Sequence, residues 1–411
     1  MIRVVVTGIG AVTPVGHDSD SSFSALAEGQ SGVDKISLFD PSLYKTKISA
    51  EVKNLDLTGI LERKEAKKSN RSIHFIAKAA HEAWTQANLN LSEEQRERAG
   101  TVIGSGMQAT ETIAPNVAAY QKNPRYVSPY MIPYGVPNSF ACFVAKKYGL
   151  NGSNFTVSSA CASGTIAIGE AFEKIKSGSH DIMLCGGVES PISPLGISGF
   201  NAIRALSEEN ESPQEASRPF CSNRSGFIMG EGSGILVLES LESAEKRGAE
   251  ILAEIVGYGN YCEAKHLVAP DISGAGISKC MNQALRNAKL NKDQIDYINA
   301  HGTSTKMNDV AETKGLKSTF GDHAKKLRIS SIKGSIGHGI GAAGGIEAVV
   351  TIKSLMSGII PPTINLTTPD PECDLDYTAN HAVEQAIEYA ISNSFAFGGI
   401  NGSIILKKWS S

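Results

Sequence analysis

Residues 155–169 read Phe155-Thr-Val-Ser-Ser-Ala-Cys-Ala-Ser-Gly-Thr-Ile-Ala-Ile-Gly169. The pattern predicts a short β-strand that runs directly into a helix, with Cys161 at the junction. A thiol at the N-terminus of a helix lies at the positive end of the backbone dipole, which favours the thiolate. Cysteine is also a common filler of packed turns. This stretch alone therefore leaves both a nucleophile and a structural residue open.

The rest of the chain repeats this alternation of strand and helix. Apolar runs and helical patterns follow one another throughout, which predicts an α/β fold. Strands are expected at residues 3–7, 101–104, 181–187, 234–238 and 253–257, and helices at 72–88 and 277–290. The alternation starts again after residue 250 without a residue-level repeat. We therefore expect two halves, residues 1–250 and 251–411, in a duplicated five-layered α/β/α/β/α arrangement.

Length and composition limit the class of protein. The chain has 411 residues and a formal net charge of -3, from 39 basic and 42 acidic residues. This balance disfavours nucleic acid as the main partner. The seven cysteines are an odd number, and their spacing matches no metal motif, so we expect no metal and a reducing compartment. No apolar stretch is expected to reach the roughly eighteen residues of a membrane helix, which predicts a cytoplasmic protein with no membrane contact.

The N-terminal strand is followed by glycines that suggest a nucleotide site. Gly8-Ile-Gly10 matches half of a dinucleotide fingerprint, but Thr13 stands where the third glycine belongs. Pro14 would break the helix that holds the pyrophosphate. We interpret these glycines as a turn after the first strand and expect the protein to bind no cofactor of its own.

Three later segments share the form of the Cys161 turn, in which an apolar strand ends in glycine and small polar residues. They are residues 299–305, 330–347 and 392–401, and they contain His301, Lys333 and His338. A single histidine after a strand is often structural, and a single lysine is often a surface charge. Together with a cysteine, however, two histidines and a lysine in such turns indicate thiol-based acyl transfer.

These segments resemble those of the elongating β-ketoacyl-acyl carrier protein synthases, of the synthase II type, and of the ketosynthase α subunits of type II polyketide systems. The matching motifs are Ser159-Ala-Cys-Ala-Ser-Gly164, Asn299-Ala-His-Gly-Thr-Ser-Thr305, Lys333 to His338 with Gly341-Ala-Ala-Gly344, and Asn393-Ser-Phe-Ala-Phe-Gly-Gly399. The resemblance extends from Val6-Thr-Gly-Ile-Gly10 to Ile404-Ile-Leu-Lys-Lys408. It implies a thiolase-like fold and a ketosynthase of fatty acid or type II polyketide biosynthesis.

The resemblance also implies a reaction. An acyl chain passes from the phosphopantetheine arm of acyl carrier protein to Cys161 and is then condensed with malonyl-carrier protein by decarboxylative Claisen condensation. His301 and His338 would stabilise the enolate as carbon dioxide leaves. The backbone N–H groups of Cys161 and Phe397 would form the oxyanion hole of the acyl step, and Phe397 would also act as a gate.

The remaining matched residues would support these steps. Lys333 would have an electrostatic role in a pair with Glu347. Thr303 and Thr305 would bind the pantetheine arm, and Met107 would line the acyl pocket. The residues expected to dock the acidic carrier protein are Lys64, Lys67, Lys68, Arg125 and Arg204.

Several alternatives stay open. A homodimer and a heterodimer with a chain-length-factor subunit are both consistent with the resemblance. The alternative function is that of a non-catalytic, chain-length-factor-like subunit that only binds carrier protein, against which Cys161 argues. A serine hydrolase lacks support, because no Gly-x-Ser-x-Gly motif is present. Ala396 stands before Phe397 where the family usually has glycine, so altered gating is expected.

Overall fold

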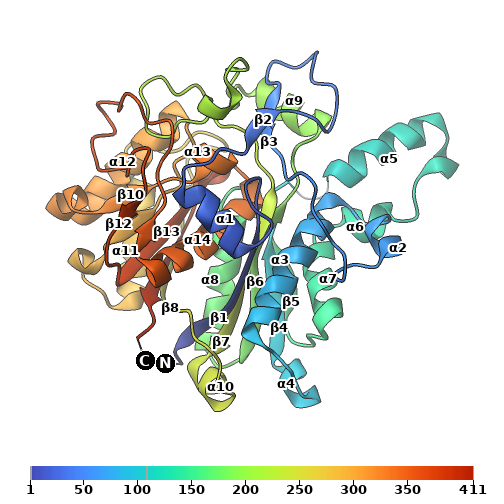
Figure 1. Cartoon of the computed structure of the whole chain (residues 1–411), viewed down its shortest axis with the longest axis horizontal. Helices are drawn as coiled ribbons and strands as arrows, with labels where there is room; N and C mark the ends of the chain where they lie inside the picture. Colours follow the sequence, from blue (N-terminus) through green and yellow to red (C-terminus); the bar gives the residue numbers. More distant parts are fainter. Residues whose placement is uncertain (1, 108–109, 411) are drawn as a thin grey trace.

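The computed structural model describes residues 2–107 and 110–410. Its main sheet consists of β1 (Val4–Val12), β4 (Ala99–Gly104), β5 (Asn154–Val157), β6 (Ile182–Glu189), β7 (Gly232–Ser240), β8 (Ala253–Cys262), β9 (Tyr297–Asn299), β10 (Arg328–Ser330), β13 (Tyr389–Ala396) and β14 (Ile400–Lys408). These ten strands lie in the order β10-β9-β13-β14-β8-β1-β7-β6-β4-β5. Figure 1 shows the sheet passing through the whole molecule, with the two termini close together.

The strand order is the same in the two halves of this sheet. Numbered in chain order within each half, the strands run 3-2-4-5-1 from β5 to β1 and again from β10 to β8. In each half the first three strands of that order are parallel. An antiparallel pairing of β1 with β8 joins the halves. The two halves thus have one topology, although their sequences show no residue-level repeat.

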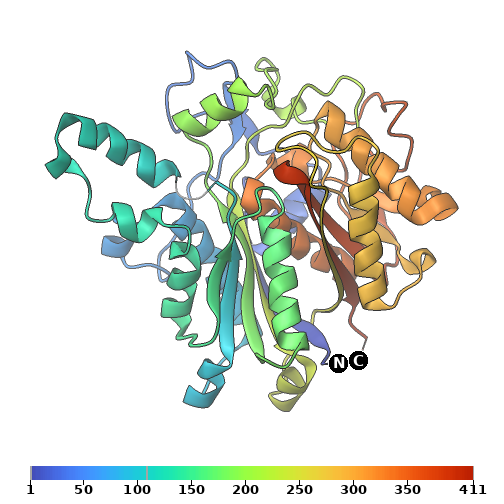
Figure 2. The same ribbon diagram turned by 180° about the vertical axis from the view of Figure 1, so that it is seen from behind.

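Helices form three layers around the two halves of the sheet. α8 (Ser163–Lys176) and α14 (Ala343–Ser357) share one core cluster with strands from both halves, so they form the middle layer. α3 (Arg71–Ala87) and α7 (Ser139–Tyr148) pack on the outer face of the N-terminal half. α11 (Ala275–Ala288) and α12 (Lys306–Phe320) pack on the outer face of the other half (Figures 1 and 2). The expected five-layered α/β fold is confirmed.

Shorter elements lie around this core. They are α1 (Ser19–Ala27), β2 (Val33–Lys35), β3 (Ile48–Ala50), α2 (Arg63–Ala66), α4 (Glu93–Glu97), α5 (Thr110–Lys122), α6 (Met131–Gly135), α9 (Pro194–Ala202), α10 (Leu241–Lys246), α13 (Lys333–Ile336), β11 (Ile359–Ile360) and β12 (Val383–Glu384). No residue of α5 is buried among the residues described. Figures 1 and 2 show α5 projecting from the side of the N-terminal half, next to α6 and α2.

The glycines of the first strand do not form a turn, so that expectation was wrong. β1 continues through Gly8 and Gly10 to Val12. A Cβ atom on Gly8 would lie 2.1 Å from Ala83 O, and one on Gly10 would lie 2.0 Å from Ala79 O. The two glycines therefore allow α3 to pack directly against the backbone of β1.

One helical stretch also contradicts the sequence analysis. Residues Ile340–Ser357 have the length and hydropathy of a membrane span, although no such stretch was expected. They comprise α14 and the turn before it, and 83% of the stretch is buried inside the protein. The stretch is apolar because α14 lies between the two halves of the sheet and is enclosed by protein over most of its length.

Candidate active site

Cys161 lies in the turn between β5 and α8. The preceding residue, Ala160, has a φ of 45°, in the left-handed region that non-glycine residues rarely adopt. Ser163 closes the turn, because its hydroxyl donates to Ala160 O at 2.6 Å and accepts from Ser159 N at 2.8 Å. The turn directs the Cys161 side chain inward, where only 7% of the residue is exposed.

Cys161 is not held as a thiolate, contrary to the expectation from the helix dipole. Burial raises the pKa of its thiol to about 12, even though the nearby Lys333 charge acts in the opposite direction. Desolvation of the sulfur is the largest cause of this raised pKa. The sulfur must lose its proton during the reaction, so a base is needed beside it.

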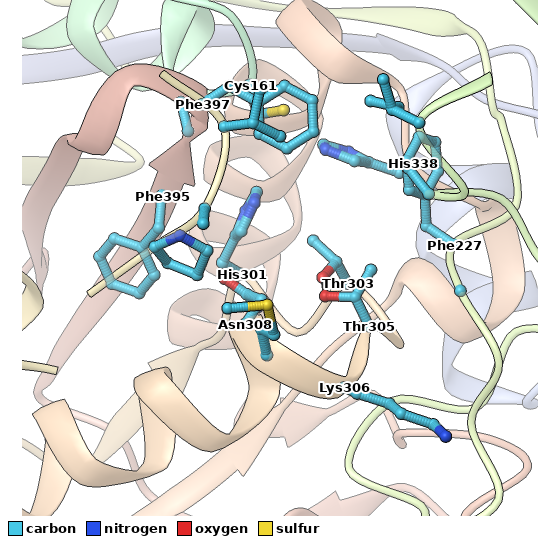
Figure 3. A pocket seen from close by; sticks show the side chains of 18 of the residues that line it. Cys161, Phe227, His301, Thr303, Thr305, Lys306, Asn308, His338, Phe395 and Phe397 are labelled. Carbon is cyan, nitrogen blue, oxygen red and sulfur yellow. Dashed lines mark hydrogen bonds between the residues drawn. The ribbon is translucent and has the colours of Figure 1, made fainter. Parts of the chain in front are cut away.

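Two histidines lie beside this sulfur. The Cys161 sulfur and ring nitrogens of His301 and His338 all lie within 4.8 Å of one another. The two imidazole centroids are 5.2 Å apart, with the rings at 85°. Figure 3 shows both rings on the same side of the pocket as Cys161 and Phe397. Burial holds the pKa of both histidines well below 6.5, so both rings are neutral at pH 7.

The repeated topology explains why these groups meet. β10 has the place in its half that β5 has in the other, so the turn with His338, before α14, is the counterpart of the Cys161 turn before α8. Glycines let the two turns approach closely. A Cβ atom on Gly164 would lie 2.8 Å from both Gly341 O and Gly345 N. The nucleophile and one histidine therefore face each other across the junction of the halves.

Lys333 is almost fully buried next to His301. Its Nζ donates to His301 O at 2.6 Å, lies 3.4 Å from His301 Nδ1 and forms an ion pair with Glu347. An ammonium group has only donors, so Nδ1 of His301 must accept. The proton of this ring is thereby assigned to Nε2. The structure thus brings together Lys333 and Glu347, as the resemblance implied.

Two buried glutamates that the sequence did not reveal hold the turns of the site. Glu312 of α12 accepts hydrogen bonds from His301 N at 2.8 Å and Gly302 N at 2.7 Å, which orients the His301 turn. Burial raises the pKa of Glu312 to about 7. No local pattern distinguishes this residue from other helical glutamates, because its burial follows only from the packing of α12.

Glu189, at the end of β6, likewise accepts hydrogen bonds from backbone N–H groups, in this case near Cys161. Its carboxylate accepts from the backbone N–H groups of Gly106 at 2.5 Å, Met107 at 3.1 Å and Gly341 at 3.1 Å. Burial raises the pKa of Glu189 to about 7. It joins the loop after β4 to the turn before α14, and so connects the two halves of the fold next to the nucleophile.

The reacting groups lie at the inner end of a pocket of about 350 Å³. Its apolar wall contains four phenylalanines, at positions 200, 227, 395 and 397. Thr303 and Thr305 line the pocket with their hydroxyl oxygens 3.0 Å apart. Figure 3 shows them between the histidines and Lys306. An elongated substrate that reaches Cys161 would pass these two hydroxyls.

The other predicted residues lie in four places. Met107 packs against the cluster that contains Cys161 but does not line this pocket. Arg204 lines the pocket and is exposed. The other cations predicted to dock carrier protein lie outside the pocket, on or just after α2 and in the turn after α5: Lys64, Lys67, Lys68 and Arg125. Of the predicted docking residues, only Arg204 thus lies at the pocket.

The gate turn has a conformation that alanine accepts. Ala396 is extended, with φ −118° and ψ 161°, and the positive φ angles follow at Gly398 (83°) and Gly399 (68°). Phe397 lies between Ala396 and Gly398 in the chain, and its ring centroid is 6.4 Å from that of Phe200. The alanine therefore causes no backbone strain in this state, and an effect on gating stays a prediction.

A thiol and two neutral imidazoles are also ligands that zinc prefers. A bound ion would, however, occupy the sulfur that acyl transfer needs.

The fold and the site together define the class of protein: a thiol-dependent condensing enzyme with a thiolase-like fold.

The chain belongs to the β-ketoacyl synthase family. Residues 1–244 match the N-terminal domain of beta-ketoacyl synthases, and residues 252–367 match the C-terminal domain. The 3-oxoacyl-[acyl-carrier-protein] synthase 2 of Synechocystis sp. is 43% identical over 408 residues, which cover 99% of this chain and 98% of that protein. The protein of the same name from Staphylococcus aureus (strain MRSA252) is 44% identical over 411 residues, 99% of each chain.

Solved structures agree with this assignment over the full length of the chain. A beta-ketoacyl synthase from Burkholderia phymatum has a TM-score of 0.93 at 35% identity, with 100% of both chains covered. A chain from the complex of a type II polyketide acyl-carrier protein with its ketosynthase has a TM-score of 0.93 at 34% identity, also with 100% of both chains covered. The predicted family and thiolase-like fold are confirmed.

Proposed function

We propose that the protein accepts an acyl chain from acyl carrier protein on Cys161 and condenses it with malonyl-carrier protein, with loss of carbon dioxide. The observation that carries this function is the meeting of Cys161, His301 and His338 within 4.8 Å in one buried pocket. Full-length similarity to proteins named 3-oxoacyl-[acyl-carrier-protein] synthase 2 supports it. The substrates arrive on the carrier's phosphopantetheine arm, so the enzyme itself needs no cofactor.

The acyl step exchanges one thioester for another. The Cys161 sulfur bonds to the acyl carbon, the bond from that carbon to the pantetheine sulfur breaks, and the Cys161 proton moves to the leaving sulfur. Neither ring nitrogen of His338 has a hydrogen-bond partner among the described residues, so this neutral imidazole is free to carry that proton. The oxyanion would be bound by the N–H groups of Cys161 and Phe397.

The condensation step forms a carbon–carbon bond. Malonyl thioester loses carbon dioxide, and the electron pair that remains forms an enolate. The N–H groups of the two neutral imidazoles stabilise this charge, with Nε2 of His301 set as a donor by Lys333. The α-carbon then attacks the acyl carbon on Cys161, and the carbon–sulfur bond breaks. The released thiolate takes a proton from solvent, which restores the thiol.

Mass spectrometry of the intact protein tests this function. After incubation with acyl carrier protein, the wild type should gain the mass of the acyl group, and Cys161→Ala should gain none. Cys142→Ala is the matched control, because Cys142 is an exposed cysteine that does not line the pocket. An unmodified wild type would instead support the non-catalytic, carrier-binding alternative.

We further propose a dimeric enzyme that acts in the cytoplasm. β5 is an edge strand whose residues are at least partly exposed, and α5 presents Val117 and Tyr120 to solvent, so both have surface to share with a partner. All seven cysteines are free, as in a reducing compartment. A solved ketosynthase/chain length factor is also similar, with a TM-score of 0.91 at 33% identity.

The pathway depends on the partner. Condensation by the purified protein alone would support a homodimer in fatty acid synthesis. Activity that appears only after co-expression with a chain-length factor would support a heterodimer in type II polyketide synthesis. Light scattering on the active species gives its subunit number.

A further inference from the structure

Lys306 is a pocket residue to which the proposed function gives no role. It follows Thr305 directly and is the first residue of α12. Figure 3 shows it at the end of the pocket furthest from Cys161, beyond the two threonines, with its side chain extended away from the reacting groups. A single segment, residues 301–306, therefore leads from His301 in the interior to a cation at the surface.

The charge at this end of the pocket is not neutralised by the protein. Lys306 and Arg204 both line the pocket and are both exposed. Within residues 2–107 and 110–410, neither side chain forms a salt bridge. Glu263, the acid that lines the same pocket, accepts hydrogen bonds from Asp271 N and Asn401 Nδ2. Both donors are uncharged, so the two cations and this one carboxylate leave the pocket lining with a formal net charge of +1.

The order of groups along the pocket matches the order of groups along the substrate arm. A carrier-bound pantetheine has a thioester at its tip, two amides in the middle and a phosphodiester where it joins the carrier. The pocket has the nucleophile at its inner end, the hydroxyls of Thr303 and Thr305 in the middle and Lys306 at its mouth. A phosphodiester carries a negative charge, and lysine binds phosphate oxygens as a point charge.

We infer that Lys306, assisted by Arg204, is a specificity residue that binds the phosphodiester of the phosphopantetheine arm. This inference rests on the proposed function, since it requires a phosphopantetheine substrate. The backbone N–H groups of the first turn of α12 add to the positive potential at the same place. The site would distinguish a phosphorylated arm from the same arm without phosphate, independently of any contact with the carrier protein.

Three substrates with the same saturated acyl group test the inference: the acyl carrier protein, the free 4'-phosphopantetheine thioester and the free pantetheine thioester. The rate of Cys161 acylation is measured against substrate concentration at low salt. For wild type, KM should be about three- to tenfold lower for the phosphopantetheine thioester than for the pantetheine thioester. In Lys306→Ala most of this preference should be lost, with a small remainder due to Arg204, and kcat should be unchanged.

Two further variants serve as controls. Lys306→Arg keeps the charge and should retain most of the preference for phosphate. Lys326→Ala removes an exposed lysine of the same half that does not line the pocket, and it should behave as wild type. The preference of the wild type should decrease as salt screens the charge.

Three outcomes would overturn the inference. If Lys306→Ala raised KM only for the carrier-bound substrate, Lys306 would contact carboxylates of the carrier instead. If it raised KM equally for both free thioesters, Lys306 would only shape the pocket. A wild type with no preference for the phosphorylated arm would also exclude the subsite. Failure of the proposed function looks different, because Cys161 would then gain no acyl group from any of the three substrates.

Discussion

Cys161 is deeply buried, and its thiol must lose a proton in the proposed reaction. Burial raises the pKa of the thiol to about 12, so only a small fraction of Cys161 is thiolate at pH 7. As long as the pH stays below the pKa, raising it by one unit increases this fraction about tenfold. Alkylation of Cys161 by iodoacetamide should therefore accelerate continuously from pH 7 to pH 9. Peptide mass spectrometry gives the rate at Cys161 itself. A plateau near neutral pH would show a depressed pKa and contradict the prediction.

His301 should be needed for condensation more than for acyl transfer. Its Nε2 proton is set by Lys333 and is directed at the enolate, whereas His338 is the proposed base of the acyl step. His301→Ala should lower kcat of condensation by about 10²–10³-fold and still form the acyl-enzyme. Intact-mass spectra and product formation measure the two steps separately. Equal losses in acyl transfer and condensation would refute separate roles for the two histidines. His81→Ala, on α3, is the control and should affect neither step.

Replacing Lys333 alone should lower the free energy of unfolding more than replacing Lys333 and Glu347 together. Both side chains are almost fully buried, so Lys333→Met leaves an unpaired carboxylate in the interior. We expect the free energy of unfolding to fall by about 3–5 kcal/mol in this variant. In the double variant Lys333→Met/Glu347→Leu most of this loss should be recovered. Denaturant titrations of the single and double variants test the pair, and additive losses would exclude coupling between the two residues.

At the scale of elements, the close approach of α8 and α14 positions the nucleophile. A methyl group on Gly164 would meet the backbone of Gly341 and Gly345, which cannot move away as a flexible side chain can. Gly164→Ala should therefore destabilise the protein by about 1–3 kcal/mol and reduce kcat, since it displaces the Cys161 turn. Thermal unfolding and condensation assays measure both effects.

Gly199 provides the matched control for this packing argument. It lies in α9, and a Cβ atom there would have nothing within 4 Å. Gly199→Ala should not destabilise the protein, because alanine is favoured over glycine inside a helix, and it should leave activity unchanged. If the two alanine variants behaved alike, the glycine contact between α8 and α14 would not matter for the site.

How far the sequence predicts an element depends on whether its signal is local. The strand-to-turn pattern correctly placed Cys161 and His301 in turns that follow strands, because small residues after apolar runs are a local signal. It was wrong for His338, since the short helix α13 separates this residue from β10. The same reasoning failed for Gly8 and Gly10, since only the packing of α3 shows that they belong to a strand. Glu312 was missed for a similar reason, because its partners lie ten and eleven residues earlier in the chain.

At the scale of the whole molecule, charge should guide the carrier protein to the pocket. Lys64 and Lys67 are exposed on or beside α2, separate from Arg204 at the pocket. The double variant Lys64→Glu/Lys67→Glu should lower kcat/KM for acyl carrier protein by about tenfold at low salt. The free pantetheine thioester should react as with wild type. A loss with both substrates would mean that the variant disturbs the fold, and no loss with either would exclude docking at α2.

The duplication itself was predictable, but its geometry was not. The alternation of strands and helices indicated two halves, and the shared strand order agrees with this. Sequence could not show that the His338 turn, rather than the His301 turn, is the counterpart of the Cys161 turn, because no residue repeat aligns them. The raised pKa of Cys161 was also out of reach, since it depends on how completely both halves enclose the sulfur.

The glycine contact between α8 and α14 has a consequence for synthesis of the chain on the ribosome. Gly164 and Cys161 emerge well before Gly345, and N-terminal segments generally fold first. A nascent chain that ends near residue 250 would therefore hold the nucleophile without either histidine. Decarboxylation of malonyl thioester would begin only once the last third of the protein has been made and has docked, so unfinished chains cannot consume the substrate.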